Sequence, residues 1–271
     1  MQEKLILVKK SDSICTVIIN RPAKHNTLCP ELLQEMTAVF RSLDSDSSIH
    51  VVVLRGAGEK VFCAGYDLSI VPAVVEEVTD KTTQGQAVTR EEDLMNVAME
   101  AICDCRCPVI AMIFGPCVGA GCDLAAACDL RLAASTARFA IPAVRRGVIY
   151  PPDSIRRVMS LIGVGATREL VFSADFIDAA RAREIGLVNR VVDAKELVEA
   201  TYSLAKSISR NGPLALAATK KAISKYVQAA RLSPAEEEEV QKLAMRCAMS
   251  EDFQEGIRAF LEKRQPRFQG K

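Results

Sequence analysis

Two turns of small residues, each following an apolar strand, are the features of this chain best suited to chemistry. The segment Val51-Val52-Val53-Leu54 leads into Cys63-Ala64-Gly65-Tyr66, and Val109 to Ile113 leads into Gly115-Pro116-Cys117-Val118-Gly119-Ala120. Small side chains let backbone N–H groups approach a ligand closely. Two such turns placed together can supply the two donors of an oxyanion hole, which stabilises negative charge on a carbonyl oxygen.

Four segments in a fixed order resemble the enoyl-CoA hydratase/isomerase (crotonase) superfamily, and the resemblance runs from Leu5 to Phe268. These segments are Asn20-Arg21-Pro22 with Asn26 and Leu28, FCAGYDL (62–68), GPCVGAGCDLAAACD (115–129) and EGIRAFLEKRQPRF (255–268). The resemblance implies an α/β fold, a crotonase-like spiral of ββα units with a helical C-terminal region. It also implies a core over residues 1–195 that holds a CoA-thioester site, and a helical region over 196–271 for oligomerisation.

Composition limits the other classes of function. The chain has 271 residues, 49% of them hydrophobic, with a net charge of +1. This size supports a large core, and the balanced charge gives nucleic acid or an anionic membrane no basic stripe to bind. No apolar run is long enough to span a bilayer. The ten cysteines suit free thiols in a reducing, cytoplasmic setting, and the alternate spacing of Cys103, Cys105 and Cys107 is not typical of a metal site.

Apolar periodicity predicts a strand-rich front half and a helical back third. The segment between Asp67 and Asn96 is more polar, and we expect a mobile loop or a partly helical lid there. The main expected elements are strands at 5–8, 15–20, 51–55, 109–114, 130–134 and 139–141, and helices at 30–43, 91–102, 121–128, 153–162, 165–172, 179–185, 194–211, 214–230, 234–249 and 251–264.

The resemblance assigns the oxyanion donors to the backbone N–H groups of Tyr66 and Ala120. A helix that begins near Gly121 would add the positive end of its dipole. Hydratases of this family use two glutamates, and the matching positions here are Asp123 and Ala143. Hydration needs proton transfer at two carbons, so we expect ordinary enoyl-CoA hydration to be poor. One acid can still move a proton in an isomerisation.

Tyr150, three residues after Gly147, is similar to a tyrosine of the methylmalonyl-CoA decarboxylase branch of the superfamily. The leading interpretation is an enoyl-CoA isomerase or atypical hydratase that uses Asp123. The alternatives are a decarboxylase of malonyl-type thioesters that uses Tyr150, and a non-catalytic or moonlighting CoA-binding member. Asp153 is a weaker candidate for a base, and its other interpretation is the N-cap of a helix starting at Ser154.

The resemblance also implies the CoA contacts and the partners. The substrate is an acyl-CoA, which carries coenzyme A itself, so no separate cofactor and no metal are expected. Relatives form trimers and dimers of trimers, which predicts a homotrimer or homohexamer. The expected CoA-binding residues are Lys24, Cys63, Ala64, Tyr66, Asp67, Leu68, Phe260 and Lys263.

Overall fold

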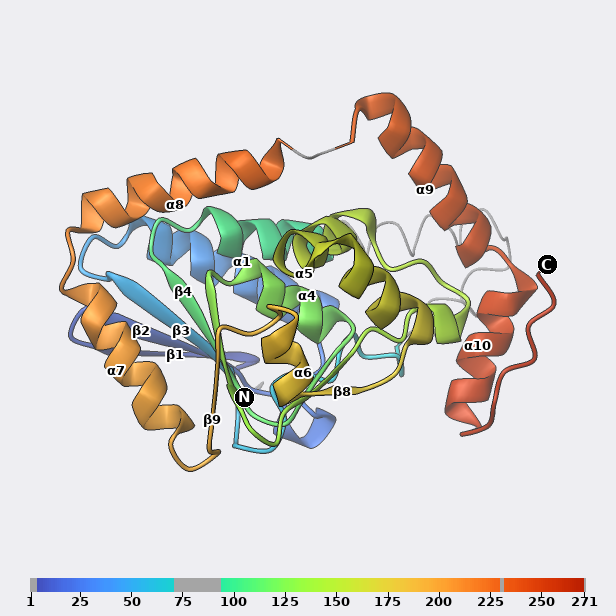
Figure 1. The fold of residues 1–271 in the computed structure, drawn as a ribbon, viewed down its shortest axis with the longest axis horizontal. Helices are drawn as coiled ribbons and strands as arrows, with labels where there is room; N and C mark the ends of the chain where they lie inside the picture. The colour runs from blue at the N-terminus through green and yellow to red at the C-terminus, as the bar shows by residue number, and fades with distance from the viewer. Residues whose placement is uncertain (1–3, 71–93, 230–231, 271) are drawn as a thin grey trace.

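The structure is a computed structural model that describes residues 4–70, 94–229 and 232–270. A six-stranded sheet has the order β1-β2-β3-β4-β6-β9, and a three-stranded sheet has the order β5-β7-β8 (Figure 1). The strands of the large sheet are β1 (Ile6–Ser11), β2 (Ile14–Ile19), β3 (Val51–Gly56), β4 (Val109–Ile113), β6 (Leu130–Ala134) and β9 (Arg190–Val192). Among the described strands of the large sheet, β1 and β2 form an antiparallel hairpin, and the other neighbours are parallel.

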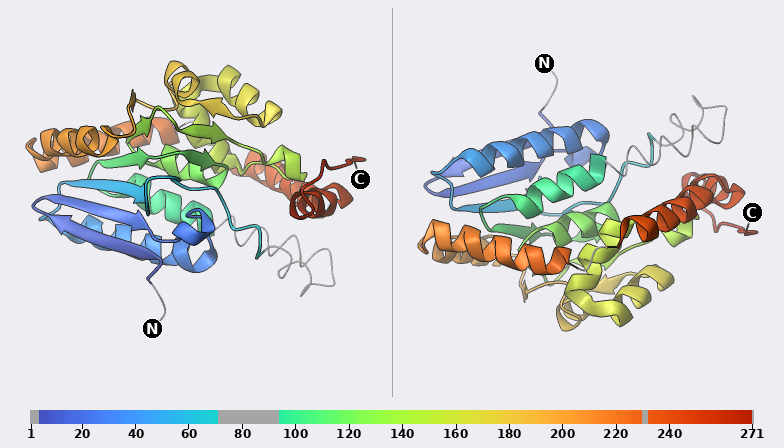
Figure 2. Two further views of the ribbon diagram at one scale, coloured as in Figure 1. Left: turned by 90° about the horizontal axis from the view of Figure 1, so that it is seen from below. Right: turned by 90° about the horizontal axis from the view of Figure 1, so that it is seen from above.

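The two faces of the large sheet are covered by different helices, which is why its central strands are continuous apolar runs. Val52 and Leu54 of β3 belong to the main core, which includes residues of α1 (Pro30–Ser45) and of the helical residues 94–104. Val51 and Val53 point to the opposite face and pack with α7 (Leu197–Ser209). Figure 2 shows α1 and the 94–104 helix side by side against the sheet.

The small sheet and the helices around it position the two glycine-rich turns. Its strands are β5 (Pro116–Val118), β7 (Arg138–Ala140) and β8 (Ile177–Asp178), and short helices lie at η1 (Pro22–Lys24), α4 (Ala120–Ala127), η2 (Val144–Arg146) and α6 (Ala179–Glu184). The helix α5 (Pro152–Ser173) is interrupted at Gly163, whose φ is 71°. This positive φ breaks the helix into the two segments that the sequence predicted.

The C-terminal region is helical, as predicted. It contains α8 (Pro213–Gln228), α9 (Pro234–Ala248) and α10 (Glu251–Leu261) after α7. Ser233 and Ser250 cap α9 and α10 with their side chains. In Figure 1 the chain runs from α8 along one edge of the molecule to α10 at the far end. The division into two parts at residue 195 stays a prediction, although α7 packs on the large sheet.

The α/β class and the family architecture are confirmed, with differences in the short elements. Strands β5, β8 and β9 have three, two and three residues, which is too short for an alternating pattern to reveal. The hairpin turn is tighter than expected, because β1 extends to Ser11. The expected lid after Asp67 falls mostly on 71–93, outside the described residues.

Candidate active site

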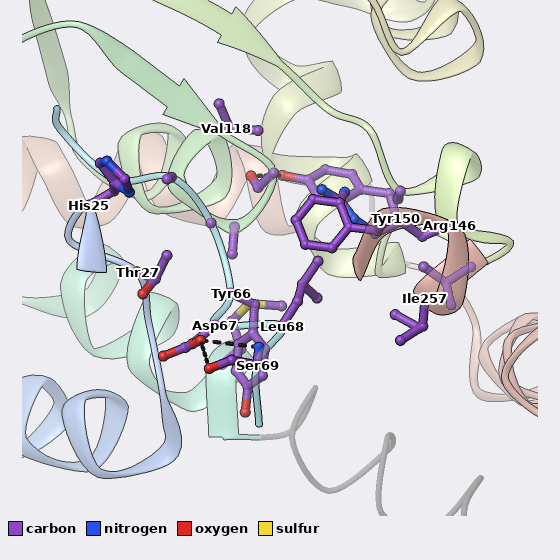
Figure 3. A pocket seen from close by; sticks show the side chains of 18 of the residues that line it. His25, Thr27, Tyr66, Asp67, Leu68, Ser69, Val118, Arg146, Tyr150 and Ile257 are labelled. Carbon is purple, nitrogen blue, oxygen red and sulfur yellow. Dashed lines mark hydrogen bonds between the residues drawn. The ribbon is translucent and has the colours of Figure 1, made fainter. Parts of the chain in front are cut away.

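A cavity of about 480 Å³ lies where the two glycine-rich turns meet α10. The first turn contributes Ala64 to Ser69, the second contributes Val118, Gly119 and Ala120, and α10 contributes Phe253, Ile257 and Phe260. Figure 3 shows His25 and Thr27 at one side of this pocket and Tyr150, Arg146 and Ile257 at the opposite side. The small residues of the sequence therefore surround a space of the size that small-molecule sites have.

Backbone contacts hold the two turns together. The N–H of Phe62 donates to the carbonyl of Pro116 at 3.1 Å, and that of Val118 donates to the carbonyl of Cys63 at 3.0 Å. A Cβ added at Gly121 would lie 2.3 Å from the carbonyl oxygen of Cys63. Gly65 has a φ of 101°, and a Cβ there would lie 2.9 Å from the carbonyl oxygen of Val118. These glycines are needed because backbone approaches backbone.

Both residues expected to form the oxyanion hole line the pocket. Ala120 is the first residue of α4, so its N–H has no acceptor within the helix. The N–H of the preceding Gly119 is used by the carbonyl of Ala140 at 2.8 Å. Tyr66 lies on the facing turn and also borders the cavity. An anionic oxygen between these two residues would also face the positive end of the α4 dipole.

Asp123 lies away from the pocket. Its side chain is completely buried, and both carboxylate oxygens bind Arg157, with Nε–Oδ1 at 2.7 Å and Nη2–Oδ2 at 3.0 Å. Ser154 donates a further hydrogen bond to Oδ2 at 2.6 Å. Asp123 is not among the residues that line the cavity. This geometry argues against the expected role of Asp123 as a proton carrier. Arg157 neutralises the charge of the carboxylate, and Arg157 and Ser154 together occupy both of its oxygens.

The Asp123–Arg157 pair joins three helices. Asp123 belongs to α4, Arg157 belongs to α5, and Nη1 of Arg157 donates to Asn96 of the 94–104 helix at 3.0 Å. The Arg157 side chain is only 5% exposed. A paired and hydrogen-bonded charge of this kind fixes how helices pack. The bidentate partner of Asp123 could not be recognised in the sequence.

Asp153 is not the N-cap of α5. The helix begins at Pro152, its N-cap is Pro151, and Asp153 lies in the first turn. There the Asp153 carboxylate pairs with Arg156 at 2.8 Å, and the residue does not border the cavity. The N-cap interpretation was therefore wrong by two positions, since a proline pair precedes the acid and proline is favoured at the start of a helix.

Tyr150 and Ala143 both line the cavity. The Tyr150 hydroxyl donates to the carbonyl of Gly119 at 3.2 Å, next to the proposed oxyanion position. Burial raises the pKa of Tyr150 well above its ordinary value, and the nearby charge of Asp123 adds to this. The phenol is therefore a neutral hydrogen-bond donor at physiological pH. Ala143 leaves the position of the second glutamate without an acid.

Arg146 is a pocket residue that sequence reasoning missed. It ends η2, one turn after Ala143, and its guanidinium lies 4.9 Å from the ring centroid of Phe260. Nη1 donates to the carbonyl of Pro142 at 3.2 Å, whereas Nε is buried without a hydrogen-bond partner among the described residues. Burial lowers the pKa of Arg146. Only the spacing from Ala143 could have indicated this residue.

The expected CoA-binding residues are brought together in part. Lys24, Ala64, Tyr66, Asp67, Leu68 and Phe260 border the cavity. Cys63 does not: it is fully buried, and its backbone N–H and carbonyl are used by Pro116 and Val118. Lys263 is exposed beyond the end of α10 and lines no part of the pocket. Both placements argue against direct CoA contacts at Cys63 and Lys263.

Asp67 is held by its own partners. Arg21 binds its Oδ2 at 2.8 Å, and Ser69 donates to its Oδ1 at 2.6 Å. Burial raises the pKa of Asp67, but the hydrogen bonds from Ser69 and Arg21 outweigh this and leave the pKa below its ordinary value. The carboxylate therefore stays ionised and fixes the first turn.

The described residues contain neither a group of metal ligands nor a membrane-spanning helix. Within the described ranges, no three His, Cys, Asp or Glu side chains are grouped so that they could hold a metal ion. None of the helices in that part of the chain combines the length and apolar character needed to cross a membrane.

Comparison with known proteins shows the family of this chain. The family model described as enoyl-CoA hydratase/isomerase matches residues 9–271. The chain belongs to this family. It is 34% identical to the short-chain-enoyl-CoA hydratase of Clostridium acetobutylicum, with 97% of each chain covered. It is 32% identical to the peroxisomal Delta(3,5)-Delta(2,4)-dienoyl-CoA isomerase of Arabidopsis thaliana, over 97% of this chain and 95% of that protein.

Among solved structures, the family member methylmalonyl-CoA decarboxylase in complex with 2-nitronate-propionyl-CoA is similar in fold. The TM-score is 0.89 at 30% identity, with 99% of each chain covered. The enzymes named in these comparisons catalyse hydration, isomerisation and decarboxylation. This chain is an enzyme of the enoyl-CoA hydratase/isomerase family.

Proposed function

We propose that this enzyme decarboxylates a malonyl-type acyl-CoA, a thioester with a carboxylate on its α-carbon. The observation that carries the proposal is that neither Asp67 nor Asp123 has a carboxylate free to transfer a proton in the pocket. Among the described residues that line the pocket, the only carboxylate is Asp67, which Arg21 already binds. Asp123 is buried outside the pocket in its pair with Arg157. Hydration and isomerisation both need a group that takes a proton from carbon or water, and neither acid is placed to do so.

Decarboxylation reaches an enolate without a base. The bond between the α-carbon and the carboxylate carbon breaks, carbon dioxide leaves, and the electron pair of that bond becomes the enolate. Water then supplies one proton at the α-carbon and gives the shortened thioester. The oxyanion hole is what this route requires most, because negative charge moves onto the thioester oxygen in the transition state.

The pocket residues divide between these steps. The N–H groups of Tyr66 and Ala120 hold the thioester oxygen, and the α4 dipole favours its charge. The Tyr150 phenol, whose single O–H is donated to the Gly119 carbonyl, orients the departing carboxylate by turning this O–H toward it when the substrate binds. Coenzyme A lies along the first turn and α10, with Lys24 near its phosphates and Ala64, Asp67, Leu68 and Phe260 beside it.

The fold similarity to a methylmalonyl-CoA decarboxylase supports the proposal. We keep two further expectations as proposals. The enzyme is cytoplasmic, and it assembles as a homotrimer or homohexamer. Ile223 and Tyr226 of α8, which are three residues apart and 60% and 84% exposed, support self-association, because neighbouring exposed apolar side chains on a helix favour burial against a partner.

The test offers malonyl-CoA, methylmalonyl-CoA and crotonyl-CoA to the purified enzyme and follows carbon dioxide and thioester masses. We expect carbon dioxide from a malonyl-type thioester, slow hydration of crotonyl-CoA, and a lower decarboxylation rate in Tyr150→Phe. The absence of carbon dioxide from both malonyl-type thioesters would refute the proposal.

The second candidate function is double-bond isomerisation or atypical hydration with Asp123 as the acid. The similarity to a dienoyl-CoA isomerase and a short-chain-enoyl-CoA hydratase favours it. It requires the carboxylate of Asp123 to separate from Arg157 and turn into the pocket. Fast crotonyl-CoA hydration or dienoyl-CoA isomerisation that Asp123→Asn abolishes would establish this function in place of decarboxylation.

A further inference from the structure

The end of the pocket at Ala143 carries a positive charge. Ala143 is the N-cap of the 3₁₀ helix η2, and Arg146 is its last residue. Side chains three residues apart lie on the same side of a 3₁₀ helix, and both residues border the cavity. Where a two-glutamate hydratase has a carboxylate, this pocket therefore has a methyl group and a neighbouring guanidinium.

The guanidinium of Arg146 has contacts that fix its position, but one of its N–H donors has no hydrogen-bond acceptor among the described residues. Nη1 donates to Pro142, the Phe260 ring lies against the group, and the buried Nε has no hydrogen-bond partner in the described part of the chain. Leaving a buried charged donor unpaired costs about 1–3 kcal/mol or more. Arg146 as a whole borders the cavity, and a guanidinium can bind both oxygens of a carboxylate through two parallel hydrogen bonds.

The place of Arg146 in the pocket indicates which anion it binds, the phosphates of coenzyme A or a carboxylate on the acyl group. Lys24, the expected contact of the CoA phosphates, is the last residue of η1, and Figure 3 shows the next residue, His25, across the pocket from Arg146 and Tyr150. Tyr150 contacts Gly119 beside the oxyanion position. The ring that Arg146 contacts, Phe260, is one that we expect beside coenzyme A. We place the charge of Arg146 toward the acyl group because it shares η2 with Ala143 and lies across the pocket from His25.

We infer that Arg146 is a specificity residue that binds a carboxylate on the acyl group, so that the enzyme selects dicarboxylic acyl-CoA thioesters over monocarboxylic ones. This inference rests on the proposed function for the location of the acyl group and adds the residue that selects the substrate. The contact is strongest while the carboxylate is charged and weakens as carbon dioxide leaves, so it tightens substrate binding and does not accelerate the chemical step.

The test measures binding with thioethers that cannot react. Calorimetry compares 2-carboxypropyl-CoA with propyl-CoA, which differ by one carboxylate. A charge-assisted hydrogen bond contributes about 1.5–3 kcal/mol, so the wild-type enzyme should prefer the carboxylated ligand by about 10- to 150-fold. Arg146→Met should remove this preference and leave the affinity for propyl-CoA within about 3-fold, a change of less than about 0.7 kcal/mol.

Arg145→Met is the matched control, because the neighbouring Arg145 forms an exposed ion pair with Asp175 on the surface. It should keep the full preference. Arg146→Lys keeps the positive charge but loses the paired N–H donors of the guanidinium, and should keep only part of the preference for the carboxylated ligand. This second variant serves as the test if Arg146→Met does not fold, which thermal unfolding reports.

Two results would overturn the inference. One is a wild-type enzyme that binds both ligands equally. The other is an Arg146 variant that weakens both ligands by the same factor, which would place the guanidinium on coenzyme A. The outcome is separate from that of the proposed function. A preference that depends on Arg146 without release of carbon dioxide would support the inference and refute decarboxylation, whereas carbon dioxide release with an unchanged preference in Arg146→Met would do the reverse.

Discussion

Replacing Asp123 by asparagine should destabilise the protein far more than it slows the reaction. The change leaves the guanidinium of Arg157, 5% exposed, without its counter-charge. Removing one partner of a buried ion pair costs about 3–5 kcal/mol. In a protein of this size each 1 kcal/mol lowers the Tm by about 2–4 °C, so the expected decrease is roughly 6–20 °C. If Asp123 carried a proton instead, the rate would fall by about 10²–10⁴.

The assay combines thermal unfolding, followed by circular dichroism, with carbon dioxide release well below the Tm. Asp175→Asn is the matched control, because it removes an exposed ion pair with Arg145 that should contribute at most about 1 kcal/mol. The decisive variant is Asp123→Leu combined with Arg157→Met. Replacing both charges by apolar side chains should restore most of the Tm, except for about 1 kcal/mol from the Ser154 hydroxyl that loses its acceptor.

The double variant should also keep decarboxylation within about 10-fold of the wild type, a difference of about 1.4 kcal/mol in activation free energy. A double variant that is stable but inactive would refute the structural role of Asp123. The same conclusion would follow if Asp123→Asn kept the wild-type Tm while its rate fell by two orders of magnitude or more.

Three further predictions concern the pocket. Ala120→Pro deletes one oxyanion donor at the first helical position, where proline is tolerated, so kcat should fall by about 10²–10³ with little change in Tm, as steady-state kinetics and unfolding would show. Ala143→Glu places an anion beside the substrate carboxylate, which should raise the KM for a malonyl-type thioester while crotonyl-CoA binding is less affected; equal effects on both would contradict the charge argument. Asp67 has a lowered pKa, so its stabilising contribution is complete above about pH 4 and is lost as the pH falls through the folded-state value. Asp67→Asn should therefore show a smaller decrease in Tm between about pH 5 and about pH 3 than the wild type, and an equal decrease would contradict the assignment.

The parts of the fold that could be predicted from sequence are those with long, regular patterns. The apolar runs of β3 and β4 and the apolar face of α1 are local signals, and they appear as expected. Strands β5 and β8 could not be predicted, because two or three residues form a strand only when partners such as β7 are already in place. Their existence depends on tertiary structure.

The candidate site divides in the same way. The turn residues Tyr66 and Ala120 could be located because the segments around them resemble the family, and the structure shows that close backbone contact requires the glycines at 65 and 121. The surroundings of Asp123 could not, because its partner Arg157 is 34 residues away and nothing local indicates the pairing. Arg146 was missed for a related reason: it faces the cavity beside α10, far along the chain.

The contact between α10 and η2 makes the pocket depend on the last helix of the chain. A Cβ on Gly256 of α10 would lie 2.5 Å from the backbone of Arg146, and one on Gly147 would lie 2.7 Å from the carbonyl oxygen of Asp252. Phe253 and Ile257 then pack with Tyr66, Leu68 and Val148 as a small cluster of their own.

During synthesis, the two glycine-rich turns are therefore made before α10, the helix that lines the other side of the pocket. We expect a ribosome-bound chain that has folded only through α7 to leave the proposed oxyanion site open to solvent, and to bind thioesters weakly until residues 251–261 emerge and dock. The same separation suggests a route for directed evolution. Exchanging α10 between family members would alter the end of the pocket that contacts Arg146, and would leave both glycine-rich turns intact.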